Sequence, residues 1–164
     1  MTGRTLGGFV VAASVAALLS CTGTAGSPAA TTSATATSIG PLVLTDKGCT
    51  YQGPAQVKPG SVALQMTNET KVKFNLDVWR LNDGHTYAEL AAHIKEEQRR
   101  AATGEPELGH PSFAGLFDQE SLASGTETKT IRALTPGTYG FVCIAFAKQG
   151  PGAIWVAGPL VVAA

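Results

Sequence analysis

The sequence is poor in charge and in side chains that bind metals. Charged residues make up 15% of the chain, which has three cysteines, three histidines and two methionines. The 12 basic and 12 acidic residues balance and form no basic patch, so we expect no nucleic-acid binding. Ser-His-Asp, His-Glu-x-x-His, phosphate-loop and paired-carboxylate patterns are all missing, and we therefore expect a protein that is not an enzyme.

The apolar run near the start of the chain is too short to cross a bilayer, which takes about 20 residues. This run, Leu6–Leu19, carries no charge and follows a single early positive charge, Arg4. A short apolar stretch behind a positive charge is typical of a secretory signal. We therefore predict a signal peptide over residues 1–20.

The end of this run, Leu18-Leu19-Ser20-Cys21, resembles the bacterial lipobox. The resemblance implies cleavage before Cys21 and acylation of this cysteine with two or three chains, palmitate among them. Such an anchor holds a protein stably at a membrane. We expect the protein at the extracytoplasmic face of the cell membrane, and the alternative is a secreted protein whose signal is cut elsewhere.

The stretch after the signal has the composition of a flexible linker. Residues 21–38 consist of Cys21 and a tract dominated by Ala, Thr, Ser and Gly that contains no charge, which predicts a flexible tether. From Ile39 onward short apolar segments alternate with Gly- and Pro-rich turns, so we place one folded domain over residues 39–164.

About seven short strands are predicted within this domain. They run over Pro41–Thr45, Ser61–Thr67, Val72–Leu81, Thr126–Ala133, Thr138–Phe146, Ile154–Val156 and Gly158–Val162. We expect the fourth and fifth segments to pair through the turn Pro136-Gly137. The whole is an all-β Greek-key sandwich with one inserted surface helix.

The third segment shows the clearest alternation. Val72, Phe74, Leu76 and Val78 are predicted to point inward, and Lys71, Lys73, Asn75 and Asp77 outward. The alternation fails after Val78, where a bulge or the end of the strand is expected.

The inserted helix is predicted over Thr86–Ala102. Thr86 and Glu89 form a capping box, and Gly104 marks the end of the helix. Its charges, Lys95 to Arg100, are typical of a solvated face. The following stretch, Gly104–Gly125, is predicted to be a long loop that is functional or partly mobile.

One motif links the chain to a known family. Leu134–Cys143, LTPGTYGFVC, places a turn before a strand that ends on a cysteine and whose two faces are both apolar. It resembles the cupredoxins, whose penultimate strand follows such a turn and delivers a cysteine to copper. Asn68–Arg80 lacks the histidine that the family places there, and Ile144–Ala164 lacks both histidine and methionine. The resemblance therefore implies the fold, while its copper chemistry does not carry over and no cofactor is expected.

Two cysteines remain after Cys21. In an oxidising compartment Cys49 and Cys143 predict a disulfide, and the alternative is that Cys143 serves as a metal or redox group. The order Cys49, Trp79, Cys143 also resembles immunoglobulin domains, but Tyr139 lies four residues before the second cysteine, where that family has a tyrosine two residues before it.

The histidines offer only a weak metal site. His85, Glu89, His93 and His110 are the candidates, of which Glu89 and His93 share one helix face. We expect a lipid-anchored, cupredoxin-like envelope protein without type 1 copper that acts as a binding or scaffolding module, with the membrane and an envelope protein as partners. Alternatives are a metal or redox protein and an accessory subunit of a membrane transport or oxidase complex.

Overall fold

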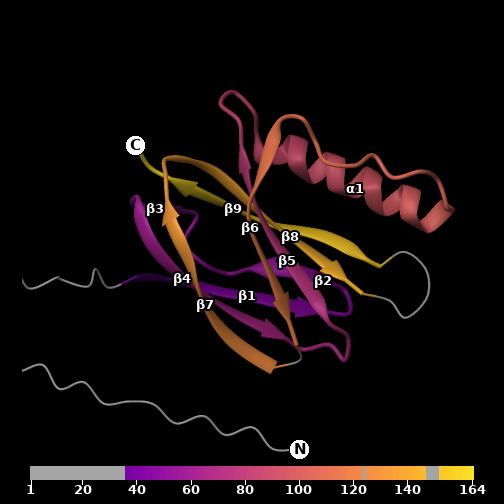
Figure 1. Cartoon of the computed structure of the whole chain (residues 1–164), viewed down its shortest axis with the longest axis horizontal. Helices are drawn as coiled ribbons and strands as arrows, with labels where there is room; N and C mark the ends of the chain where they lie inside the picture. The colour runs from indigo at the N-terminus through magenta and orange to yellow at the C-terminus, as the bar shows by residue number, and fades with distance from the viewer. Residues whose placement is uncertain (1–35, 124, 147–151) are drawn as a thin grey trace, which may run out of the picture. The chain divides into compact units, whose positions relative to one another are not determined.

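The computed structural model describes residues 36–123, 125–146 and 152–164. The predicted signal peptide, the lipidation site Cys21 and most of the predicted tether lie outside these residues. The described chain forms two β-sheets packed face to face with one helix on the outside, which is the sandwich that the cupredoxin resemblance implied (Figure 1). The first strand begins at Thr37, inside the range assigned to the tether.

Nine strands and one helix make up the described residues. The four-stranded sheet has the order β2-β1-β4-β7 and the five-stranded sheet the order β3-β9-β8-β5-β6. The elements are β1 (Thr37–Thr45), β2 (Gly48–Tyr51), β3 (Gln56–Val57), β4 (Gly60–Asn68), β5 (Phe74–Leu81), α1 (Tyr87–Thr103), β6 (Ala114–Leu122), β7 (Gly125–Leu134), β8 (Gly137–Ala145) and β9 (Ile154–Val162).

The pairing of the strands departs from an immunoglobulin sandwich, whose sheets are antiparallel. Here β1 runs parallel to β4, and β3 runs parallel to β9. The last two predicted segments form one strand, β9. This strand contains a bulge at Gly158 and Pro159, which together lie opposite the single residue between Tyr139 and Phe141 of β8.

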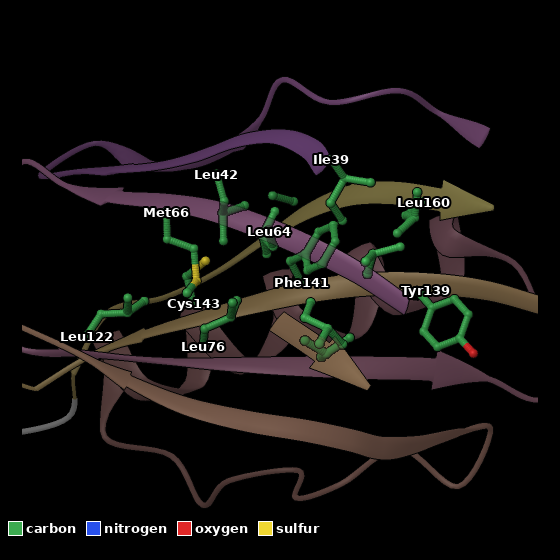
Figure 2. Close-up of a cluster of buried hydrophobic side chains, with 14 of the residues drawn as sticks. Ile39, Leu42, Leu64, Met66, Leu76, Leu122, Tyr139, Phe141, Cys143 and Leu160 are labelled. Atoms are coloured by element: carbon green, nitrogen blue, oxygen red, sulfur yellow. The ribbon is translucent and has the colours of Figure 1, made fainter. Parts of the chain in front are cut away.

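The main core fills the space between the two sheets (Figure 2). The four-stranded sheet contributes Leu42, Leu64 and Met66, among others, and β8 contributes Tyr139, Phe141 and Cys143, all fully buried. The opposite face of β8 is covered as well, because Val142 packs in a second cluster with residues of α1. Both faces of the strand in LTPGTYGFVC are thus buried, as predicted.

Strand β5 corrects the predicted alternation at two places. Val72 lies before the strand and is 41% exposed, whereas Asp77, predicted to face solvent, is only 5% exposed. The outer face is buried because α1 and the segment after it cover this part of the sheet, where Trp79 packs with Leu90 and Ile94. A bulge does occur after Val78, and it places an extra residue in the partner strand β6.

The second half of the predicted long loop Gly104–Gly125 is a strand, β6, so this part of the prediction is wrong. The residues of β6 pair with β5 in antiparallel register, at the edge of the five-stranded sheet. The side chains gave little sign of a strand: Leu116 is 44% exposed, and only Leu122 at the end is fully buried. Backbone pairing holds an edge strand whose sequence has no clear alternation.

The turn at Pro136-Gly137 joins different sheets, so the predicted pairing of its flanking strands is wrong. β7 pairs with β4, and β8 pairs with β5 and β9. Gly137 has φ of 149°, a conformation that favours glycine, and the carbonyl of Pro136 accepts a 2.9 Å hydrogen bond from Arg80 Nη2. The turn therefore carries the chain across the sandwich.

Helix α1 has the predicted caps. The Thr86 hydroxyl accepts from the Glu89 amide, the Glu89 carboxylate accepts from the Thr86 amide, and Gly104 ends the helix in the left-handed conformation. Leu90 and Ile94 are its buried residues, and they face β8 and β9. The narrow buried stripe fits a helix on the surface of the sandwich.

Candidate ligand-binding cavity

A cavity of about 250 Å³ lies under the C-terminal half of α1. We call it the helix cavity: it is bounded by α1, by the segment Glu107–Pro111 and by the outer face of β5, β8 and β9. Its apolar lining is Trp79, Ile94, Ala101, Val142, Ile144 and Ile154. Its polar lining is Asp77, His93, Glu97, Glu107 and His110. An apolar floor with a few polar groups is the usual composition of a small-molecule site.

The outer wall of the cavity is held in place by helix side chains. His93 Nε2 lies 2.9 Å from the carbonyl oxygen of Gly109, Glu97 Oε2 accepts from the Leu108 amide at 2.8 Å, and Arg100 donates to the carbonyl of Pro106 at 3.2 Å. Positions 93, 97 and 100 share one helix face. Glu97 and Arg100, predicted to be solvated, therefore hold the irregular segment of residues 106–109 against the helix. The spacing of these residues along one helix face was the only sign of this role in the sequence.

A surface ion network fixes the start of this wall. Arg99 bonds both Glu96 and Glu105, with N–O distances of 2.6–2.9 Å. The arginine bonds lower the pKa of Glu96 to about 2 and that of Glu105 to about 2. Because Glu105 lies just beyond the helix cap, the network ties the turn after Gly104 back to α1.

Asp77 is the buried carboxyl of the cavity. It accepts a 2.7 Å hydrogen bond from Gln119 Nε2, across the β5–β6 pair. Burial raises the pKa of Asp77, and the Gln119 bond, the charge of His110 and the indole of Trp79 oppose this effect without cancelling it. None of the lining residues that the structure describes is a lysine or arginine that could compensate the carboxylate.

Trp79 lies two residues along the same strand and is 4% exposed. Its ring meets that of His110 edge-on, with centroids 4.9 Å apart. Trp79 Nε1 is buried without a hydrogen-bond partner of normal geometry in the described part of the chain. A buried N–H without an acceptor is costly, and such groups are rare in folded proteins.

The candidate metal ligands do not form one cluster. His85 Nδ1 lies 3.2 Å from Glu89 Oε1, while His93 bonds the backbone of Gly109. Phe113 stacks on His85 and meets His93 edge-on, with centroid distances of 5.2 and 6.1 Å. Over residues 36–123, 125–146 and 152–164, no group of three or more His, Cys, Asp or Glu side chains is arranged to hold a metal ion.

Cys143 forms a disulfide with Cys49, 94 residues earlier in the chain. The predicted bond is thus present, and it links β2 of one sheet to β8 of the other. Cys143 is fully buried and lies between Leu76 and Trp155 in the strand register. Type 1 copper needs a free thiolate with two imidazoles, so the residues at this position do not fit that metal.

A second depression, of about 460 Å³, lies on the other side of α1 between the helix and β2. Its lining includes Cys49, Trp155 and the exposed residues Lys47 and Lys95. It is open to solvent, and none of its described lining residues is a buried polar group comparable to Asp77. The helix cavity is therefore the better candidate site.

The comparisons with known proteins return auracyanins among the structural neighbours. No protein-family model matches the chain. No curated protein matches it either. The chain is similar to the dithionite-reduced auracyanin of the photosynthetic bacterium Roseiflexus castenholzii, at 20% identity and a TM-score of 0.39, over 79% of this chain and 98% of that one. It is also similar to auracyanin A, described as a "blue" copper protein of Chloroflexus aurantiacus, at 20% identity and a TM-score of 0.39, over 76% and 98% of the two chains.

Proposed function

We propose that this protein is a lipid-anchored binding protein of the cell envelope that holds a small molecule in the helix cavity. The observation that carries the proposal is the pair Asp77 and Trp79 on the floor of that cavity. Asp77 is a buried carboxyl with no lysine or arginine among the described lining residues, and Trp79 has a buried indole N–H that makes no hydrogen bond of normal geometry with any described residue. Burial of the carboxylate and of an indole N–H without a well-formed hydrogen bond costs the fold free energy. Perturbed buried groups in a concave site are typical of binding or catalytic sites.

The rest of the molecule serves as a rigid support for this site. The disulfide and the interlocked core fix the two sheets, and α1 is fastened to the outer wall of the cavity by side-chain bonds. This role requires neither copper nor catalysis. An envelope protein that receives the ligand from this domain would be the partner.

Membrane attachment is assigned to the lipid on Cys21. No helix among the residues that the structure describes is long and apolar enough to span a membrane. The tract of residues 22–36 would act as the spacer between the acylated cysteine and β1.

The proposal is tested by a titration with mixed small-molecule fragments of either charge and of none. The protein is the full chain with Cys21→Ser, labelled with ¹⁵N, and the readout is the indole N–H resonance of Trp79 compared with that of Trp155 outside the cavity. We expect at least one class of fragment to shift Trp79 and leave Trp155 in place. Equal shifts at both indoles, or none at Trp79 with any fragment, would contradict a ligand site in the cavity.

A further inference from the structure

We propose that the ligand of the helix cavity is a small organic ammonium ion with an apolar body and a hydrogen-bond acceptor next to the charged nitrogen, as in aryl amino alcohols. This inference rests on the proposed function and names the chemical class that the site would select.

The charge of the lining favours a cation. Its titratable groups among the described residues are Asp77, Glu97 and Glu107, with His93 and His110, and none of the described lining residues is a lysine or arginine. Glu97 already accepts from the Leu108 amide. Among the described residues Asp77 accepts one hydrogen bond of normal geometry, from Gln119, and a carboxylate can accept several bonds, so it has capacity for an ammonium group. An anion would instead meet three carboxylates.

The aromatic floor favours the same class. Trp79 presents the best of the aromatic rings for binding a cation, and the ring is almost completely removed from water. Electrostatic attraction between an ammonium group and an indole is strongest where both are desolvated. An ammonium placed near Asp77 therefore lies next to a second favourable partner two residues along the strand.

The indole N–H of Trp79 indicates the acceptor. Trp79 Nε1 can only donate. It interacts with the Asp77 carboxylate, but it makes no hydrogen bond of normal geometry with any described residue. A ligand hydroxyl or carbonyl oxygen next to the ammonium group would accept from it. The Asp77 carboxylate and the Trp79 indole N–H lie on one strand face, two residues apart. They thus match a ligand that carries an ammonium group and a hydrogen-bond acceptor on neighbouring atoms.

The apolar lining completes the match. Ile94 of α1, Val142 and Ile144 of β8 and Ile154 of β9 surround the cavity. These side chains offer a ring-sized apolar surface beside the polar pair, and the cavity of about 250 Å³ has room for a ligand of about ten non-hydrogen atoms.

The test uses three probes of one size and shape that differ in charge: 2-amino-1-phenylethanol, the neutral 1-phenylethane-1,2-diol and the anion mandelate. Affinities are measured by titration of the Cys21→Ser full chain, with Trp79 indole shifts as the site report. We expect the amine to bind at least about tenfold more tightly than the diol, the difference that one desolvated charge partner makes. Mandelate should be the weakest. Equal or tighter binding of the diol or of mandelate at Trp79 would overturn the ammonium class and leave the proposed function standing.

Two variants assign the interactions. Asp77→Asn should weaken the amine at least about tenfold and leave the diol unchanged, whereas the matched control Asp83→Asn, in an exposed turn, should change neither. Trp79→Phe keeps a ring and removes the N–H, so it should abolish the preference for 2-amino-1-phenylethanol over phenethylamine, which lacks the hydroxyl.

Amine affinity unchanged in Asp77→Asn would overturn the inference, as would failure of all three probes to bind. The fragment titration, which does not depend on charge, then decides separately whether the proposed function falls as well.

Discussion

Leu90 of α1 packs directly onto the backbone of β8 at Gly140, so closely that a Cβ at position 140 would lie 2.5 Å from Leu90 Cδ2. Tyr87 of the same helix lies next, at 3.6 Å. Glycine at this strand position therefore allows the helix to lie close to the sheet.

Gly140→Ala is expected to destabilise the fold by about 1–3 kcal/mol, because the added methyl group overpacks the contact with Leu90. The measurement is the free energy of unfolding from denaturant titration. Gly115→Ala is the matched control: this β6 glycine has open space where a Cβ would go, so its substitution should change stability by less than about 0.5 kcal/mol. Equal effects of the two substitutions would contradict close packing at position 140.

The disulfide is expected to leave no free thiol at Cys49 or Cys143 in the oxidised, denatured chain with Cys21→Ser. Replacing both cysteines should lower the free energy of unfolding by about 2–5 kcal/mol, since the bond closes a loop of nearly a hundred residues in the unfolded chain. Two thiols in the oxidised protein would refute the bond and return Cys143 to the candidate redox groups.

Asp77→Asn is expected to stabilise the free protein at neutral pH. The pKa of Asp77 is raised by burial in the fold, so its protonated form contributes stability that is present below the unfolded pKa and is lost as the pH rises through the folded pKa. Asparagine stays neutral and can still accept from Gln119.

The check is unfolding of both proteins as a function of pH. The advantage of Asp77→Asn should be present at pH 7 and should vanish at a pH below the pKa of an unfolded aspartate, about 3.9. A variant less stable than the parent at pH 7 would show that the carboxylate is stabilised in the fold. Combined with weaker binding of the amine, higher stability would mark Asp77 as a residue retained for ligand binding at a cost to the fold.

Glu97→Ala is expected to loosen the outer wall of the helix cavity while changing global stability by only about 1 kcal/mol. The Leu108 amide loses its acceptor in this variant. Hydrogen exchange at this amide should therefore become faster, and exchange in β8 should not change. Lys95→Ala, on the exposed side of the same helix, is the control, and faster exchange at Leu108 in that variant as well would argue against a specific role for Glu97.

Cys21→Ser is expected to abolish incorporation of labelled palmitate into the full chain. A single serine keeps the signal region otherwise intact, so the variant separates acylation from export. Labelling that persists in Cys21→Ser would contradict the lipobox interpretation.

Local signals in the sequence predicted local structure well. The capping box of Thr86 and Glu89 set the start of α1, and LTPGTYGFVC predicted a strand buried on both faces. These features depend on residues close together in the chain, whose side chains and turn chemistry carry their own signal.

Features that depend on contacts between distant parts of the chain could not be predicted from the sequence. β6 is held by backbone pairing with β5, which leaves no pattern in the side chains. The turn at Pro136-Gly137 has the same residues whether it joins paired strands or crosses between sheets. Asp77 and Trp79 became a candidate site only because α1 and the segment after it, from later in the chain, cover their face of the sheet.

The disulfide also makes the chain between its two ends a closed covalent ring. This ring, from Cys49 to Cys143, contains α1 and the irregular segment Glu107–Pro111 that forms the outer wall of the helix cavity. A protease that cuts the exposed part of this segment, Glu107–His110, opens the ring without releasing either piece, because the sulfur bridge still joins them. The nicked protein therefore remains one molecule of unchanged mass, apart from one added water, until a reductant separates its halves.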